Sequence, residues 1–182
     1  MIQKAVILIF IFLAAIIQFS LFPALFPLGI CPDLLLMSVI FWALRNGFEK
    51  TAARAVLAGF LADLFHFQPV GTDILLFSLA AFGASSLAKR FLVSHRAWGF
   101  FFTSGVVAAG TIAYAVSSNF VGNVFHFGGE YGQAINSGYI PDWSIALKVI
   151  FNLAVFALVS RPLEKIEKTF ELYGQRMPGF RK

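Results

Sequence analysis

The residues best placed to do chemistry are ionisable side chains that interrupt apolar sequence. Asp63 stands inside an apolar run, about 18 Å along a helix that starts near Thr51. Asp33 stands at the expected start of another helix, where a carboxylate can cap free backbone N–H groups. Lys148 lies about one and a half turns into the last apolar segment. In a medium that solvates charge poorly, each of these groups needs a partner or a water-filled pocket.

Lys148 shares a helical face with Ser144 and Asn152, because the three residues follow one another at i, i+4 spacing. We expect this face to point into a helix bundle and to meet Asp63 or Asp33. The predicted polar cluster therefore consists of Asp33, Asp63, Lys148 and Asn152. Two roles stay open, a cluster that fixes the register of the helices and a site for a ligand or proton, and the first is favoured.

Other chemistry has little support in the sequence. His66, His95 and His126 are scattered, and neither an HExxH nor a Gly-x-Ser-x-Gly motif is present. Asp63 with His66 at i+3 is at best half of a metal site, and the single Cys31 excludes an internal disulfide. No basic run is interleaved with aromatic residues, as nucleic-acid binding would favour. We therefore expect no enzyme, no cofactor, no metal and no nucleic-acid partner.

The composition indicates which elements must position these groups. Hydrophobic residues make up 59% of the 182 residues and charged residues 13%, whereas about a quarter of residues are charged in soluble domains. Thirteen of the 14 Lys and Arg residues fall in four short clusters, at positions 4, 45–54, 89–96 and 161–182. Because short basic loops stay in the cytoplasm, each apolar stretch between the clusters must cross the bilayer and return.

The charge pattern therefore predicts an all-α membrane protein, a bundle of about six short transmembrane helices in the cytoplasmic membrane with both termini in the cytoplasm. The expected helices are residues 5–22, 33–47, 51–67, 74–89, 97–118 and 142–160. A re-entrant hairpin over residues 33–67 is the alternative. It would place Arg45, Lys50 and Arg54 at mid-membrane, where each costs about 3 kcal/mol, so two crossings are favoured.

Two further segments can be delimited. Residues 119–143 are rich in Gly and aromatic residues and lack Lys and Arg, which predicts one sizeable outer loop. Residues 1–160 form the predicted transmembrane domain, and residues 161–182 form an amphipathic cytoplasmic tail. In this tail Leu163, Ile166, Phe170 and Tyr173 fall on one helical face. That face can lie along the inner surface of the lipid bilayer or bind a partner, and the first is favoured.

Three segments carry a resemblance to a known family. They are Pro32-Asp33-Leu34-Leu35-Leu36, then Gly59-Phe60-Leu61-Ala62-Asp63-Leu64, then Pro69-Val70-Gly71 leading into the next helix. In order and spacing they resemble the MreD family of rod shape-determining proteins. The resemblance is best over the second to fourth helices, and Ala62 departs from the glycine that the family often has there.

The resemblance implies a non-enzymatic inner-membrane subunit of the bacterial cell-elongation machinery. It implies as partners the single-pass protein MreC, the actin-like MreB, RodA and a class B penicillin-binding protein. MreD proteins also look like relatives of the substrate-binding membrane subunits of energy-coupling vitamin transporters, which remain the alternative. Against that alternative, residues 5–22 lack the Ala-x-x-x-Ala pattern with which such subunits dock, and the outer loops offer few side-chain donors for a vitamin.

Overall fold

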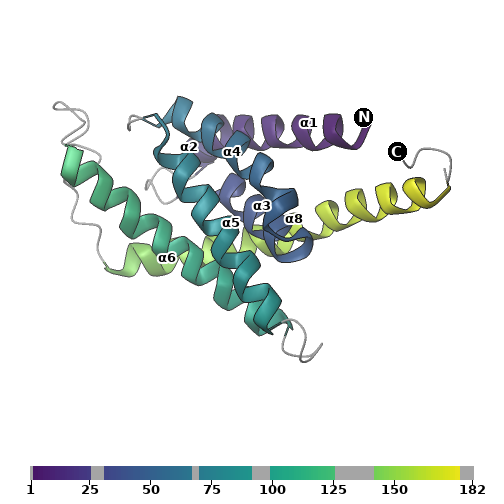
Figure 1. The fold of residues 1–182 in the computed structure, drawn as a ribbon. Coiled ribbons are helices and arrows are strands. Elements are labelled where there is room, and N and C mark those ends of the chain that lie inside the picture. The colour runs from purple at the N-terminus through teal and green to yellow at the C-terminus, as the bar shows by residue number, and fades with distance from the viewer. Residues whose placement is uncertain (1, 26–30, 67–69, 92–98, 126–141, 177–182) are drawn as a thin grey trace.

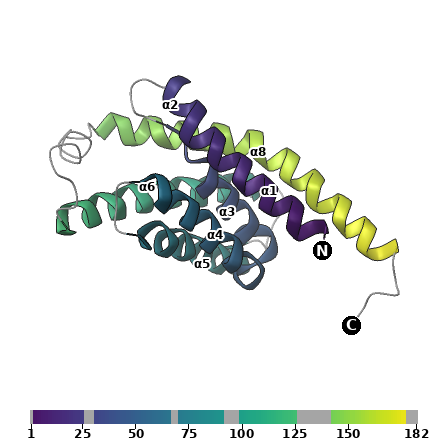
Figure 2. The ribbon, with the colours of Figure 1, turned by 90° about the horizontal axis from the view of Figure 1, so that it is seen from above.

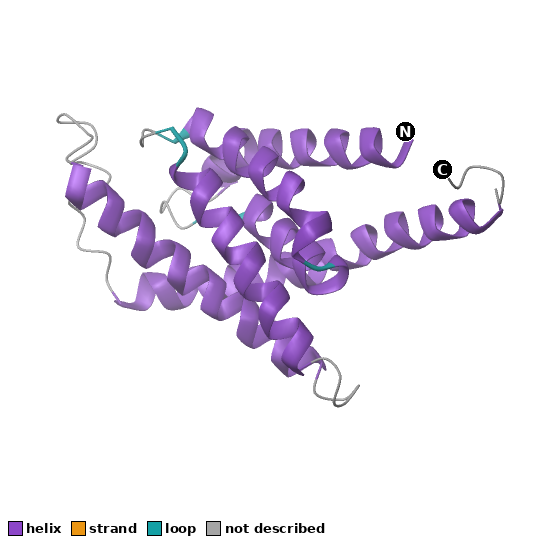
Figure 3. Cartoon of the chain, in the orientation of Figure 1, coloured by secondary structure: helices purple, strands orange, loops and turns teal. Residues whose placement is uncertain are grey.

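The computed structural model describes residues 2–25, 31–66, 70–91, 99–125 and 142–176. Within these ranges the regular elements are all helices (Figure 3). In chain order they are α1 (Ile2–Ile16), the π-helical turn η1 (Ile17–Leu21), α2 (Phe22–Leu25), α3 (Leu34–Asn46), α4 (Phe48–Phe65), α5 (Thr72–Phe91), α6 (Gly99–Phe125) and α8 (Asp142–Arg176). Because α1, η1 and α2 follow one another without a break, the described chain forms six helical segments (Figure 1).

Helix length and composition suit a bilayer. In the described part of the chain, three segments are long and apolar enough to cross a membrane: Ala5–Leu25, Thr72–Arg90 and Ala146–Thr169. α3 and the Phe102–Ser117 part of α6 are shorter apolar helices. The prediction of an all-α membrane protein is confirmed.

The helix ends fall into two groups at opposite ends of the bundle (Figure 1). The start of α1, the turn between α3 and α4, the end of α5, the start of α6 and the end of α8 share one end. We call it the basic end, because it carries Arg45, Lys50, Arg54, Lys89 and Arg90. The opposite end, called the acidic end, carries Asp33, Asp63 and Asp73. Successive helices therefore run in alternating directions.

α3 is the central helix of the bundle. It contacts α1, α4, α5, α6 and α8, and it lies between them in the view from above (Figure 2). Its side chains are buried almost all round, including Leu35, Leu36, Val39 and Trp42. A helix of 13 residues rises only about 20 Å, which is less than the roughly 30 Å of a hydrocarbon core. The first turn of α3 therefore lies inside the protein, where its free N–H groups cannot reach bulk water.

A glycine allows α4 and α5 to approach each other closely. A Cβ atom on Gly59 would lie 2.5 Å from the Cα of Ile74 and 2.7 Å from the carbonyl oxygen of Asp73. Both atoms belong to the backbone of α5 and cannot rotate away. Close backbone approach of this kind stabilises helix pairs in lipid, where burial of apolar surface supplies little driving force.

Two segments differ from the sequence-based prediction. α6 continues to Phe125, so the helix takes in the first part of the predicted loop of residues 119–143. Val121, Val124 and Phe125 extend the apolar sequence of the helix, which gives a physical reason for the continuation. The rest of that predicted loop, residues 126–141, lies outside the described residues. α8 likewise does not stop near residue 160 but continues through Pro162 to Arg176.

Candidate functional site

The buried first turn of α3 is satisfied by side chains from three helical segments. The backbone N–H of Leu35 donates to Oε1 of Gln18, at 2.9 Å, and that of Leu36 donates to Oδ1 of Asp33, also at 2.9 Å. The N–H of Asp33 donates to Oδ1 of Asn152, at 2.7 Å. In a lipid environment every such group must be paired within the protein. The Asp33 cap therefore belongs to a wider set of acceptors around one helix end.

Gln18 reaches this helix end from the π-helical turn η1. The π turn adds one residue per hydrogen-bonded ring, and such turns often occur where a side chain serves a special purpose. Gln18 is buried, on the same face as Ile7, Ile11, Ala14 and Ala15. Gln18 is the one strongly polar residue of the apolar run 5–22, and its target on α3 is visible only in the folded structure.

Asn152 joins three helices. Its Oδ1 accepts a hydrogen bond from the N–H of Asp33 at the start of α3. Its Nδ2 donates to Oγ1 of Thr111 in α6, at 3.0 Å. The hydroxyl of Thr111 in turn donates to the carbonyl oxygen of Val107. Asn152 is fully buried, with 0% of its surface exposed. Its acceptor Oδ1 and its donor Nδ2 therefore both have protein partners.

Asp63 binds the start of α5. Its Oδ2 accepts from the N–H of Gly71 and its Oδ1 from the N–H of Asp73, both at 2.8 Å. The predicted pairing with Lys148 is not among the contacts of the described residues, because both carboxylate oxygens already serve this helix start. Gly59 and Asp63, one turn apart on α4, thus face the same end of α5.

Asp73 lies at the centre of a second set of contacts. Its Oδ1 accepts from the hydroxyl of Tyr114 in α6, at 2.7 Å, and its Oδ2 pairs with Nδ1 of His66. The carboxylate is fully buried, whereas His66 is partly exposed at the end of α4. Lys148 of α8 lies with its Nζ 5.9 Å from the centre of the Tyr114 ring. This distance suits a cation–π contact.

The polar residues at the acidic end form these two sets of contacts, which together we call the acidic-end cluster: Gln18, Asp33, Asn152 and Thr111 in the first set, and Asp63, His66, Asp73, Tyr114 and Lys148 in the second. Of the four predicted cluster residues, Asp33 and Asn152 contact each other directly. Asp63 is linked to Lys148 only through two other residues: Asp63 accepts from the N–H of Asp73, Asp73 accepts from the hydroxyl of Tyr114, and Lys148 lies against the Tyr114 ring. Among the described residues no three His, Cys, Asp or Glu side chains form a group suited to a metal ion.

A second polar group lies at the basic end and holds α8. Glu167 of α8 is buried, and its carboxylate accepts from Nδ2 of Asn46 at 2.6 Å and pairs with Nε of Arg45 at 2.8 Å. Nη1 of Arg54 lies 3.4 Å from the same carboxylate. Glu164 adds a longer contact with Arg45, at 3.6 Å. The stretch predicted as a tail is therefore fastened here to the turn between α3 and α4.

The four residues of the predicted partner-binding face are placed differently from one another. Leu163 is 1% exposed and packs in the core of the bundle, so it does not present a free surface. Ile166 is half-buried. Phe170 and Tyr173 lie within α8, but their side chains are outside the described residues. Glu167 follows Ile166 in a charge-rich stretch, and its burial could be found only from the fold.

Comparison with known protein families shows the family to which the chain belongs. The family described as "rod shape-determining protein MreD" matches residues 1–161 of the 182-residue chain. The chain belongs to the MreD family. Neither a curated protein nor a solved structure matches it significantly, so the predicted likeness to transporter subunits stays a prediction.

The three segments that resemble the MreD family have definite tasks in this fold. Asp33 caps the central helix α3, and Gly59 and Asp63 together position the start of α5. Gly71 has a φ of 104°, a left-handed conformation that favours glycine, and its N–H is one of the two held by Asp63. The match to the MreD family ends before Glu167, so the basic-end contacts of α8 lie outside it.

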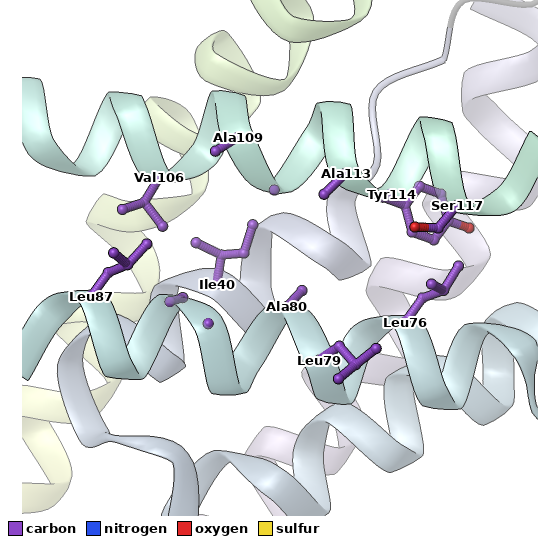
Figure 4. Close-up of a pocket in the computed structure, with 13 residues that line it drawn as sticks. Ile40, Leu76, Leu79, Ala80, Leu87, Val106, Ala109, Ala113, Tyr114 and Ser117 are labelled. Atoms are coloured by element: carbon purple, nitrogen blue, oxygen red, sulfur yellow. The ribbon is translucent and has the colours of Figure 1, made fainter.

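An apolar groove lies between α5 and α6 (Figure 4). It has a volume of about 290 Å³, and Ile40 of α3 forms its floor. Small residues line both walls: Ala80, Gly83 and Ala84 from α5, and Ala109, Gly110 and Ala113 from α6. A Cβ atom on Gly83 would meet nothing within 4 Å, so the packing described here does not require a glycine at this position.

Proposed function

We propose that this protein is a non-enzymatic scaffold subunit of the bacterial cell-elongation machinery, and that it works by holding other membrane proteins. Its membership of the MreD family supports a role in determining rod shape. The observation that carries the scaffold role is the groove between α5 and α6. Small residues allow a transmembrane helix to come close, which is the main source of helix association in lipid.

The groove suits a single apolar helix in three respects. It is open on one side, where Leu79 of α5 is exposed, and its walls lack bulky side chains over Ala80, Gly83 and Ala84. Its floor is fixed, because Gly110 accommodates Ile40 so closely that a Cβ there would lie 2.9 Å from the Ile40 side chain. We propose that the transmembrane helix of MreC is the occupant.

The remaining partners follow from the family resemblance. RodA and a class B penicillin-binding protein are proposed to bind other apolar faces, such as that of α8, on which Leu158 is 73% exposed. MreB is proposed to lie near the basic end, which we assign to the cytoplasm because basic loops stay on that side. With Leu163 in the core, this contact would depend on Ile166, Phe170 and Tyr173.

Depletion in the source bacterium tests the proposal. Loss of the protein should turn rods into spheres, and a tagged copy should recover MreC on purification. The Gly83→Leu variant should fail in both respects, because Gly83 lines the groove and a Cβ atom there meets no atom within 4 Å, so the added side chain would occupy the groove.

The same experiment separates the scaffold from the alternative. Normal rods after full depletion, together with loss of uptake of one vitamin, would establish the transporter function and overturn the scaffold proposal. Vitamin uptake is therefore measured in the same depleted cells.

A further inference from the structure

A second cavity lies at the basic end, between α1, α4 and α8. Its volume is about 700 Å³, and we call it the α1–α4 groove. One part of its lining is apolar, with Ile7 and Ile11 from α1 and Leu57 from α4. The other part is charged, with Glu49, Lys50 and Arg54 of α4 among its residues.

The two parts are arranged along the direction of the helices. On α4 the lining begins with Glu49 and Lys50 at the basic end and reaches Leu57 about 10 Å further along the helix. The charged part therefore lies nearer the end of the bundle, and the apolar part nearer its middle. A membrane phospholipid has the same order, with its headgroup at the surface and its chains toward the centre of the bilayer.

The charges in the groove have capacity left for a ligand. Among the described residues, neither Glu49 nor Lys50 forms an ion pair, and both are exposed. Arg54 lies with Cζ 5.0 Å from the centre of the Trp42 ring and touches Glu167 through Nη1 alone, at 3.4 Å. Glu167 itself is already neutralised by Arg45. One free carboxylate and two cationic groups thus face the same space.

We propose that the α1–α4 groove binds a phospholipid with a zwitterionic headgroup of the phosphoethanolamine type. Lys50 and Arg54 bind the phosphate, Glu49 binds the ammonium group, and an acyl chain lies along Ile7, Ile11 and Leu57. The balance of charges selects this headgroup, because an anionic headgroup leaves Glu49 facing a like charge. Guanidinium and ammonium groups are the usual phosphate ligands in proteins.

Titration of the purified full-length protein by native mass spectrometry tests the proposal. The probes are dioctanoyl phosphatidylethanolamine, dioctanoyl phosphatidylglycerol and dioctanoylglycerol, which has no phosphate. One molecule of phosphatidylethanolamine should bind more tightly than either of the others. Lys50→Ala should weaken its binding about tenfold, as the loss of one charge-assisted hydrogen bond implies.

Two further variants separate the groove from general lipid contact. Ala53→Trp fills the groove from an exposed position of α4 and leaves the charges in place, so it should also weaken binding. Lys89→Ala is the matched control, because Lys89 is an exposed cation at the same end outside the groove. It should bind as the unmodified protein does.

Three results would overturn the proposal. Dioctanoylglycerol binding as tightly as phosphatidylethanolamine would show that no phosphate is recognised. Tighter binding of phosphatidylglycerol would contradict the role of Glu49. Equal binding by the unmodified protein, Lys50→Ala and Ala53→Trp would place the lipid elsewhere on the protein.

Discussion

The side-chain oxygen of Asn152 accepts a hydrogen bond from the backbone N–H of Asp33, which lies 119 positions earlier in the chain. Because the same amide donates to Thr111, one buried side chain joins α3, α6 and α8. The contact also satisfies a backbone group at the start of the short central helix. The position of α8 on the bundle thus depends on a helix end that cannot reach water.

Replacing Asn152 with Ala should lower the free energy of unfolding by about 1–3 kcal/mol, because the buried N–H of Asp33 loses its acceptor and the Thr111 hydroxyl loses the hydrogen bond that it accepts. Thermal unfolding in detergent measures the change. Thr111→Val, alone and combined with Asn152→Ala, completes a double-mutant cycle. Strictly additive effects would mean that the two side chains do not interact in solution.

Gly59→Ala should destabilise the protein by about 1–3 kcal/mol or more, because the new methyl group meets the backbone of Ile74. Gly83→Ala is the matched control, since a methyl group there meets nothing. Equal melting temperatures for the two variants would be incompatible with the close approach of α4 and α5.

Much of this fold could be predicted from sequence. The basic clusters mark the boundaries between helices, because Lys and Arg in short loops set the orientation of helices in a membrane. Asp33 after a proline is a local signal for a helix cap. The contacts of Asp63 were less predictable. An acidic residue in an apolar run suggests a cationic partner such as Lys148, but the nearest unsatisfied groups are the backbone N–H groups of Gly71 and Asp73. Those become visible only once α5 is placed beside α4.

The charge-swapped pair Asp63→Lys with Lys148→Asp should therefore not recover stability. Asp63→Lys removes both acceptors from the start of α5 and should cost about 1–2 kcal/mol, the usual value of a helix cap. A carboxylate at position 148 cannot replace them. A melting temperature of the double variant above that of Asp63→Lys alone would show that a direct pair with Lys148 matters after all.

Glu167→Ala should loosen the later turns of α8 from the bundle. Arg45, Asn46 and Arg54 would lose their shared acceptor, at a cost of about 1–3 kcal/mol because the carboxylate is buried. Hydrogen exchange over residues 163–169 should become faster. Lys165→Ala is the control, since Lys165 is exposed and belongs to no ion pair of the described residues. Unchanged exchange in Glu167→Ala would indicate that Leu163 alone holds this stretch.

Glu167 also marks a limit of sequence-based prediction. Its neighbours Glu164, Lys165 and Lys168 form a pattern typical of a solvated helix face. Periodicity gives the relative directions of side chains on one helix but not which neighbour each direction meets. Asn46 and Arg54, more than 110 positions earlier in the chain, bind the carboxylate of Glu167 and bury it.

The central claim is that the groove between α5 and α6 receives a partner helix, and a comparison of two glycine variants tests it most directly. Gly83 lines the groove and Gly105 does not, and a Cβ atom at either position meets nothing within 4 Å. Gly83→Leu and Gly105→Leu should therefore fold equally well. Tagged copies of both are expressed in depleted cells, and the MreC that co-purifies is quantified. The account predicts that Gly83→Leu loses MreC while Gly105→Leu retains it, and equal recovery of MreC by the two variants would contradict the account.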